Sequence, residues 1–157
     1  MKTDIKTLPI NLLLLFSLIG FLDALYLTIS HFQGNEAGCF LVHGCDIVLN
    51  SKYSEIFGLP TAFLGLLFYL VIFLGVFVYN FKKDENLIKK ILLITPLGFL
   101  ATLWFLYLQA VVLRAFCSYC LLSAVASTLI FLTGMSILWQ QKKKERFAEK
   151  GEKMLES

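Results

Sequence analysis

Residues 115–141 read AFCSYCLLSAVASTLIFLTGMSILWQQ. This stretch has no Asp, Glu, Lys or Arg and is longer than the ~20 apolar residues that cross a bilayer core. Residues 60–81 and 91–113 also lack these four residue types, and residues 10–32 contain a single acid, Asp23. The sequence therefore predicts an all-α membrane protein, built as a bundle of four transmembrane helices.

The overall composition excludes an ordinary soluble domain. Hydrophobic residues make up 58% of the chain and charged residues 16%, whereas soluble domains average about 45–50% and about 25%. We find no internal repeat and expect one domain over residues 1–157, with a helical core at about 10–140 and a tail at 141–157. Pro96 lies inside the third span, where proline predicts a kink.

Lysine and arginine are unevenly divided between the two sides of a four-span topology. Of the 14 such residues, all but Lys52 and Arg114 fall on the side that holds both termini. The positive-inside rule therefore predicts cytoplasmic termini, a long extracytoplasmic loop at 33–59 and a short one near 112–116. Acidic residues are interspersed with the basic ones in the tail, so we expect membrane lipid as a partner and no nucleic acid.

The N-terminus also resembles a secretory signal, because Lys2 and Lys6 precede an apolar run. That run continues beyond the length of a signal's apolar region, contains Asp23 and lacks a small-residue cleavage site. We therefore expect a retained first helix.

Four cysteines are the best candidates for chemistry, and all fall on the extracytoplasmic side of the predicted topology: Cys39, Cys45, Cys117 and Cys120. The last two form a Cys-x-x-Cys motif where the fourth span begins, a spacing typical of redox-active dithiols. A helix N-terminus favours the thiolate of Cys117. Cys120 lies one turn deeper, toward the hydrocarbon zone where a lipid-soluble quinone would bind.

The other pair lies in the glycine-rich first loop, where a Cys39–Cys45 bond would close a small ring. Such a ring constrains little chain entropy, which favours a redox purpose over a structural one. Two structural disulfides remain an alternative, and so does a four-cysteine zinc or iron–sulfur site. The spacing fits a metal site poorly, so we expect no bound metal.

Four short motifs together resemble the vitamin K epoxide reductase family: CDIVLNS at 45–51, FGLP at 57–60, GLLFY at 65–69 and CSYC at 117–120. The resemblance covers about residues 10–140. It implies a four-helix bundle around a quinone, capped by the first outer loop. The DsbB family also has four spans and a quinone, but its Cys-x-x-Cys lies in the first outer loop, the reverse of the order here.

The resemblance also implies roles for individual residues. Cys117 and Cys120 match the active-site pair that reduces the quinone, and Cys39 and Cys45 match the pair that passes electrons to it. Ser51, Thr61 and Ala124 match positions close to the quinone. Ser51 has an alternative role as the N-cap of a helix over 52–56. The animal enzymes carry Asn at position 61 and Tyr at position 124, so epoxide reduction is not carried over to this chain.

We therefore predict a thiol:quinone oxidoreductase of a bacterial inner membrane that supports extracytoplasmic disulfide formation. Ubiquinone, menaquinone and phylloquinone are equally compatible as acceptors. The chain ends soon after the fourth span, so we expect the redox partner to be a separate, DsbA-like thioredoxin-fold protein. The alternative is a non-enzymatic tetraspan scaffold or transporter with structural disulfides. Asp23, an acid inside a span, suggests a function by default and equally fits a snorkelling or hydrogen-bonded structural role. His31 and His43 are candidate proton donors near the sulfurs, with a passive interfacial position as the alternative.

Overall fold

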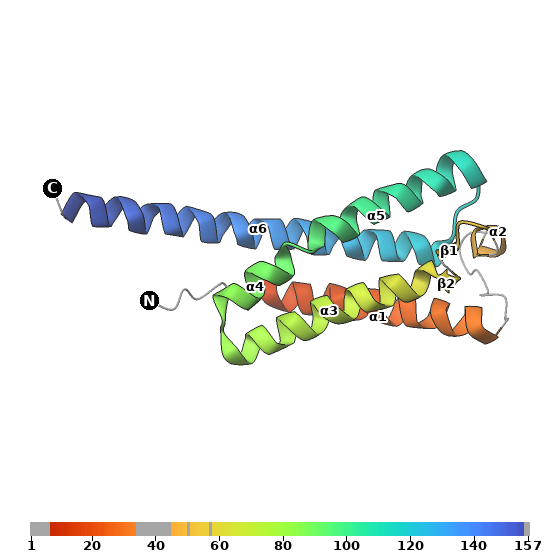
Figure 1. Cartoon of the computed structure of the whole chain (residues 1–157), viewed down its shortest axis with the longest axis horizontal. Helices are drawn as coiled ribbons and strands as arrows, with labels where there is room; N and C mark the ends of the chain where they lie inside the picture. The colour runs from red at the N-terminus through yellow and green to blue at the C-terminus, as the bar shows by residue number, and fades with distance from the viewer. Residues whose placement is uncertain (1–6, 34–44, 50, 57, 156–157) are drawn as a thin grey trace.

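The computed structural model describes residues 7–33, 45–49, 51–56 and 58–155. Long helices form a bundle, and a short helix and a small hairpin cover one end of it (Figure 1). The elements in chain order are α1 (Thr7–Gln33), α2 (Cys45–Leu49), β1 (Glu55–Ile56), β2 (Leu59–Pro60), α3 (Thr61–Lys82), α4 (Glu85–Leu92), α5 (Thr95–Tyr107), the π-helical turn η1 (Leu108–Leu113) and α6 (Ser118–Leu155).

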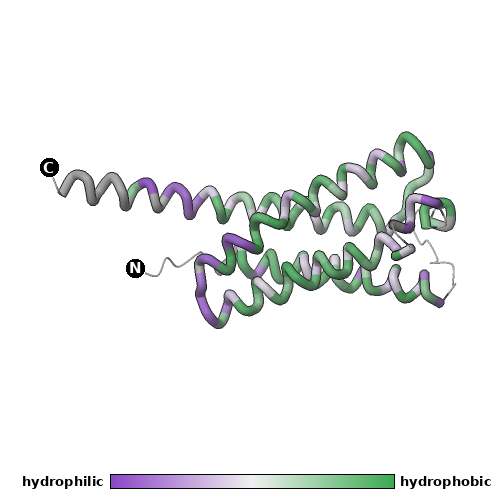
Figure 2. Tube along the Cα trace, viewed as in Figure 1, coloured by the Kyte–Doolittle hydropathy of each residue, from purple (hydrophilic) through white to green (hydrophobic). Residues whose placement is uncertain are grey.

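Within these described residues, four helical stretches are long and apolar enough to cross a membrane. They are Leu8–Gln33, Thr61–Lys82, Asn86–Leu113 and Ser118–Lys143. Figure 2 shows hydrophobic residues along all four stretches, with hydrophilic residues at the turn between α3 and α4 and where α6 leaves the bundle. The four predicted spans are thus confirmed as helices.

The third span is interrupted where Pro96 predicts a kink, and the interruption divides it into two helices. The chain leaves α4 at Leu92 and turns through two residues before α5 begins at Thr95, which puts Pro96 in the first turn of a new helix. Proline has no N–H to donate to the Leu92 carbonyl four residues earlier. The Thr95 hydroxyl donates to that carbonyl instead, with Oγ1 and O 2.8 Å apart.

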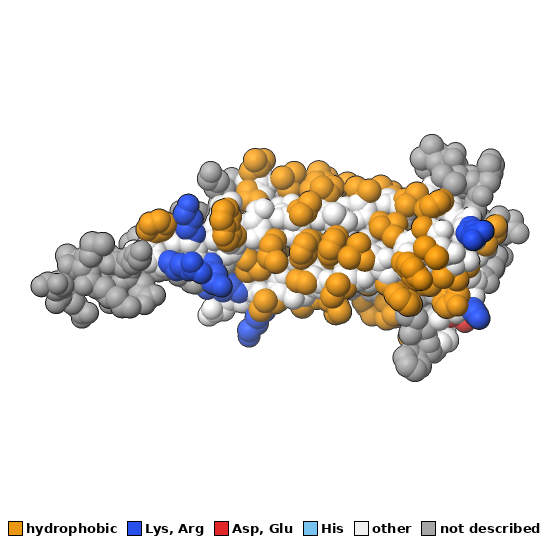
Figure 3. All heavy atoms as spheres, turned by 90° about the horizontal axis from the view of Figure 1, so that it is seen from above, with side chains coloured by type: hydrophobic (Ala, Val, Ile, Leu, Met, Phe, Trp, Pro, Cys, Tyr) orange, Lys and Arg blue, Asp and Glu red, His pale blue; other side chains and the backbone are white. Residues whose placement is uncertain are grey.

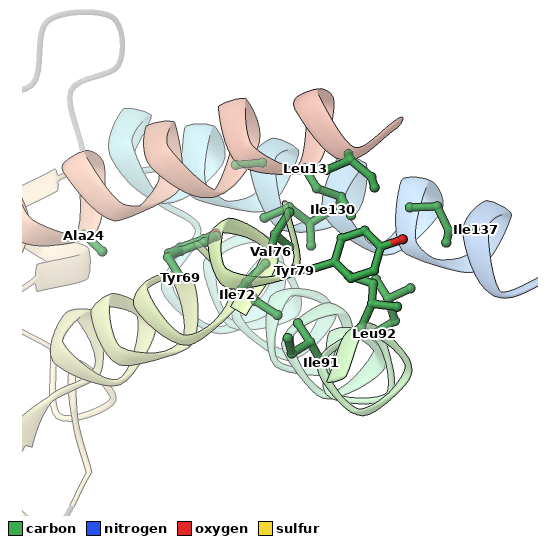
Figure 4. Packing of buried hydrophobic residues seen from close by; sticks show 13 residues of the cluster. Leu13, Ala24, Tyr69, Ile72, Val76, Tyr79, Ile91, Leu92, Ile130 and Ile137 are labelled. Carbon is green, nitrogen blue, oxygen red and sulfur yellow. The ribbon is translucent and has the colours of Figure 1, made fainter. Parts of the chain in front are cut away.

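The core lies where α1, α3, α4 and α6 meet, and it is made of fully buried aliphatic side chains around Tyr79 (Figure 4). α1 packs along both α3 and α6, whereas α5 packs mainly on α6. A Cβ added at Gly20 of α1 would collide with the Tyr69 ring of α3, so glycine is needed at this close approach. Tyr69 in turn reaches α6, where its hydroxyl lies 2.8 Å from the Ser123 carbonyl.

We call the described residues between α1 and α3, at 45–49, 51–56 and 58–60, the cap. Its two short strands pair antiparallel, with Glu55 opposite Pro60 and Ile56 opposite Leu59. Gly58 has φ +78° in the connecting turn, a conformation that other residues adopt only under strain. The predicted helix over 52–56 is therefore wrong, because this segment is a turn that enters β1.

The two ends of the bundle differ in charge. α1 begins and α6 ends at the same end as the α3–α4 turn, opposite the cap (Figure 1). Lys and Arg side chains gather at this basic end, and few lie at the capped end (Figure 3). The cytoplasmic location of the basic end stays a prediction.

Candidate active site

The Cys-x-x-Cys motif lies at the start of α6, at the capped end of the bundle. Cys117 is fully buried and directly precedes the first helical residue, Ser118. Its sulfur accepts a hydrogen bond from the Cys120 backbone N–H, with N and Sγ 3.4 Å apart. Cys117 therefore occupies the N-cap position of α6, and its side chain bonds the N–H three residues later, as capping residues do. Both cysteines are free thiols in this structure.

This position makes Cys117 an acidic thiol. A hydrogen bond from the Cys120 thiol lowers the pKa of Cys117 to about 7, with further help from the backbone N–H groups of Cys120 and Tyr119 and despite the opposing effect of burial. Because the thiolate is the nucleophile in thiol–disulfide exchange, a large share of Cys117 is reactive at neutral pH.

Gln109 holds Cys117 from the preceding span. Its side-chain Oε1 accepts a hydrogen bond from the Cys117 backbone N–H at 3.0 Å, and its backbone carbonyl accepts one from Ala115 at 3.1 Å. Gln109 lies in η1, and the chain then reverses at Arg114, which has a left-handed φ of 48°. The sequence analysis did not single out Gln109. It is the one amide side chain in the apolar stretch 91–113, and this isolated polar residue could have marked it as a candidate site residue.

The cap places a third cysteine beside this motif. Cys45, Val48, Ala115 and Cys117 form one buried cluster, and α2 packs against η1. Cys45 is disulfide-bonded, and its predicted partner, Cys39, lies outside the described residues, as does His43. The structure thus brings Cys45, from the first loop, together with Cys117, far along the chain.

A cavity of about 350 Å³ lies beneath the cap, between α1, α3, α5 and α6. Its lining is mostly apolar, and it includes Cys120 but not Cys117. The three positions predicted to contact a quinone, Ser51, Thr61 and Ala124, all line this cavity. The Ser51 hydroxyl itself donates to the Val48 carbonyl at 2.8 Å, which fixes the start of the turn that follows α2.

Two polar groups in the cavity wall had no assigned role in the sequence analysis. The Tyr69 hydroxyl contacts both the carbonyl and the hydroxyl of Ser123 at 2.8 Å. Asp23, from α1, also lines the cavity, and it is buried. Both of its carboxylate oxygens lack a hydrogen-bond partner.

The cap is also attached to the end of α1. His31 Nε2 lies 3.4 Å from the Glu55 carboxylate of β1. The Tyr26 ring stacks at a tilt on the Tyr119 ring between the two cysteines of the motif, with centroids 5.1 Å apart. Among the described residues, no three His, Cys, Asp or Glu side chains come together as a metal site would require.

Comparisons with known proteins show the family of the chain. The sequence profile of the vitamin K epoxide reductase family matches residues 11–135. The thiol-disulfide oxidoreductase LTO1 of Arabidopsis thaliana is 32% identical over 130 residues, which cover 76% of this chain and 34% of the plant protein. The matched region thus spans about a third of the length of that relative.

Proposed function

Because the chain belongs to the vitamin K epoxide reductase family, we propose that it is a membrane thiol oxidoreductase that passes electrons from protein thiols to a quinone. One observation supports this most directly. Cys120 opens onto an apolar cavity under the cap, while its neighbour Cys117 packs against the disulfide-bonded Cys45. A dithiol with one sulfur toward a second cysteine pair and one toward an apolar cavity suits an electron relay.

The cavity suits a quinone head group. It is largely apolar, as expected for a lipid-soluble ligand, and a few hydroxyl groups interrupt the apolar wall. In this proposal Thr61 donates a hydrogen bond to the quinone, Ser51 contacts the head group, and Ala124 leaves room for the ring. A bound quinone would supply a two-electron acceptor.

Electrons enter at the cap. The dithiol of a separate thioredoxin-like protein, on the extracytoplasmic side, loses two electrons and two protons as its own disulfide forms. The Cys39–Cys45 disulfide takes up the two electrons and two protons and opens into two thiols. This relay would support disulfide formation outside the cytoplasm of a bacterium, with the basic end of the bundle in the cytoplasm.

The two pairs then exchange through Cys45 and Cys117. The Cys45 thiolate attacks the Cys117–Cys120 disulfide at Cys117, a Cys45–Cys117 bond forms, and Cys120 leaves as a thiolate facing the cavity. The Cys39 thiolate next attacks Cys45, which restores the first disulfide and releases Cys117. The Cys117–Cys120 dithiol can then deliver two electrons to the quinone. The acidity of Cys117 makes it a good leaving group in this second exchange.

The test is whether the cysteines cycle. The protein in lipid nanodiscs is given dithiothreitol as the thiol donor and decyl-ubiquinone as the acceptor, and loss of quinone absorbance is followed. We expect turnover in the wild type and none above background in Cys120→Ser. Cysteines that stay oxidised, with no quinone consumed, would instead support the scaffold or transporter alternative.

A pair of matched variants tests the order of the relay. Cys39→Ala should accumulate a Cys45–Cys117 bond that mass spectrometry detects, because the cysteine that resolves it is missing. Cys45→Ala should accumulate far less of a Cys39–Cys117 bond, because Cys45 is the cap cysteine packed against Cys117. The reverse result would exchange the roles of the two cap cysteines and leave the enzyme class unchanged.

A further inference from the structure

Asp23 is an acid in the cavity wall without a hydrogen-bond partner among the described residues. Its side chain is only 7% exposed, and neither carboxylate oxygen has a hydrogen bond. The described residues that line the cavity include no Lys, Arg or His. The Ala24 carbonyl next to it already accepts the Thr28 hydroxyl at 2.7 Å. Burying an ionised carboxylate without a cation or a hydrogen-bond donor is costly, which favours the protonated form. An acid in such a position inside a membrane span is a candidate for a function.

The proposed reaction needs protons as well as electrons in the cavity. A quinone that becomes a quinol takes up two protons, and a mostly apolar cavity offers few sources of them. The Tyr69 hydroxyl is already committed, because its proton is directed to the Ser123 carbonyl and its oxygen lies 2.8 Å from the Ser123 hydroxyl. The lining groups that remain with an ionisable proton are Asp23, Cys120 and the Tyr53 phenol, and of these a carboxylic acid is ordinarily the strongest acid.

We propose that Asp23 is a catalytic acid of the cavity, which gives a proton to a quinone oxygen and recovers one from the Cys117–Cys120 dithiol. This inference rests on the proposed function. It is supported by the shared cavity wall of Asp23 and Cys120 and by the unpartnered carboxyl group. Asp23 also lies close enough to both Cys117 and Cys120 for their charges to interact.

Protons and electrons balance over one turnover. The dithiol loses two electrons and two protons as the sulfur–sulfur bond between Cys117 and Cys120 forms. The two electrons and two protons end on the quinol. Asp23 gives up its proton to one quinone oxygen and regains one of the two thiol protons, so it is protonated at the start and at the end. The other thiol proton goes to the second oxygen.

The experiment separates the two half-reactions. Protein in nanodiscs is reduced, freed of reductant and mixed with decyl-ubiquinone in a single turnover; separately, oxidised protein is reduced by dithiothreitol without quinone. We compare Asp23→Asn with Asp23→Glu, and use Gln141→Leu as the matched control. Gln141 is likewise 7% exposed with an unpartnered polar group, but it does not line the cavity.

Asp23→Asn keeps the size of the side chain and removes the acidic proton. We expect quinone reduction to slow by roughly 100-fold or more, the usual contribution of a general acid, while reduction by dithiothreitol keeps the wild-type rate. Asp23→Glu should recover part of the rate, and Gln141→Leu should match the wild type in both reactions. Infrared spectra provide a readout without quinone: a protonated carboxyl band should be present in the wild type and absent in Asp23→Asn.

Several outcomes would overturn the role of Asp23. One is a wild-type rate of quinone reduction in Asp23→Asn, and another is a wild-type protein without the carboxyl band. If Asp23→Glu, which keeps an acidic proton, is no faster than Asp23→Asn, loss of that proton does not explain the slow rate. If the wild type itself does not reduce the quinone, the proposed function fails, and the Asp23 role fails with it. Wild-type turnover together with an active Asp23→Asn variant overturns the Asp23 role alone.

Discussion

The two halves of the bundle are built from the same kind of residue but packed differently. Toward the basic end, side chains such as Ile72, Val76 and Ile130 are fully buried against one another. Toward the capped end, the same helices separate around a cavity of about 350 Å³. The cysteines of the motif and the unpartnered Asp23 belong to the capped half.

This contrast separates stability from chemistry. A close-packed interior loses favourable contacts whenever a side chain is shortened. A cavity wall has no partner atoms on its open side, so enlarging a side chain there removes space without removing contacts. Substitutions in the closed half should therefore change the free energy of unfolding, and substitutions in the cavity wall should change electron transfer.

The largest expected effect comes from filling the cavity. Ala124→Phe places a ring where the quinone head group is proposed to bind, so quinone reduction should fall by at least about 100-fold, as when a substrate is displaced from its reactive position. Reduction of the disulfide by dithiothreitol should be unchanged. The matched control is Val125→Phe, the next residue of α6, whose side chain is 57% exposed on the outside of the bundle. Equal losses in both variants would contradict a quinone site in this cavity.

The closed half should respond in the opposite way. Ile72→Ala leaves a void at a fully buried position, and we expect it to lower the free energy of unfolding by about 2–3 kcal/mol. Leu74→Ala, on the same helix but 49% exposed, should cost much less. Unfolding in detergent followed by circular dichroism measures both. A wild-type rate of quinone reduction in folded Ile72→Ala would show that packing in the closed half affects stability alone. A slowed rate would show that the two halves are coupled.

The fold was predictable because its strongest signal is local. Charge-free stretches long enough to cross a bilayer predict helices without any knowledge of their neighbours, and all four were confirmed. Two features of the fold depended on competing local effects. The helix predicted over 52–56 is a turn and a strand, since Gly58 permits a tight hairpin there. The kink predicted at Pro96 divides the third span into α4 and α5, and the Thr95 hydroxyl satisfies the carbonyl that proline leaves free.

The site was predictable only in part. The Cys-x-x-Cys spacing and the family motifs identified the cysteines and the positions of the cavity wall. The partners of these residues are set by the folded chain: Gln109 bonds Cys117, 8 residues later, through a π-helical turn, and Tyr69 bonds Ser123, 54 residues later, on another helix. Such pairings follow from tertiary packing, which neither residue type nor local spacing encodes.

The acidity of Cys117 gives a prediction of intermediate size. Its pKa is lowered to about 7, so its alkylation by iodoacetamide in the reduced protein should rise tenfold per pH unit below pH 7 and level off above it. The sign follows from the thiolate being the reactive form: a lower pKa exposes it at lower pH. Cys120→Ala removes the hydrogen bond that contributes most, so the midpoint should move upward, toward that of an ordinary thiol. Mass spectrometry of the labelled Cys117 peptide gives both curves, and an unshifted midpoint would assign the acidity to the helix N-terminus alone.

The smallest effect is expected where the cap is attached to α1. His31 and Glu55 lie 3.4 Å apart, but their side chains are 32% and 52% exposed, and exposed ion pairs contribute only about 0–1 kcal/mol. The buried cluster of Cys45, Val48, Ala115 and Cys117 should therefore hold the cap in place far more strongly.

We expect Glu55→Gln to change the rate of Cys45–Cys117 exchange very little, whereas Val48→Ala should slow it, because the position of Cys45 depends on this packing. Trapping the mixed disulfide in a Cys39→Ala background measures both. A larger loss from Glu55→Gln than from Val48→Ala would mean that the ion pair, and not the apolar cluster, brings the two cysteines together.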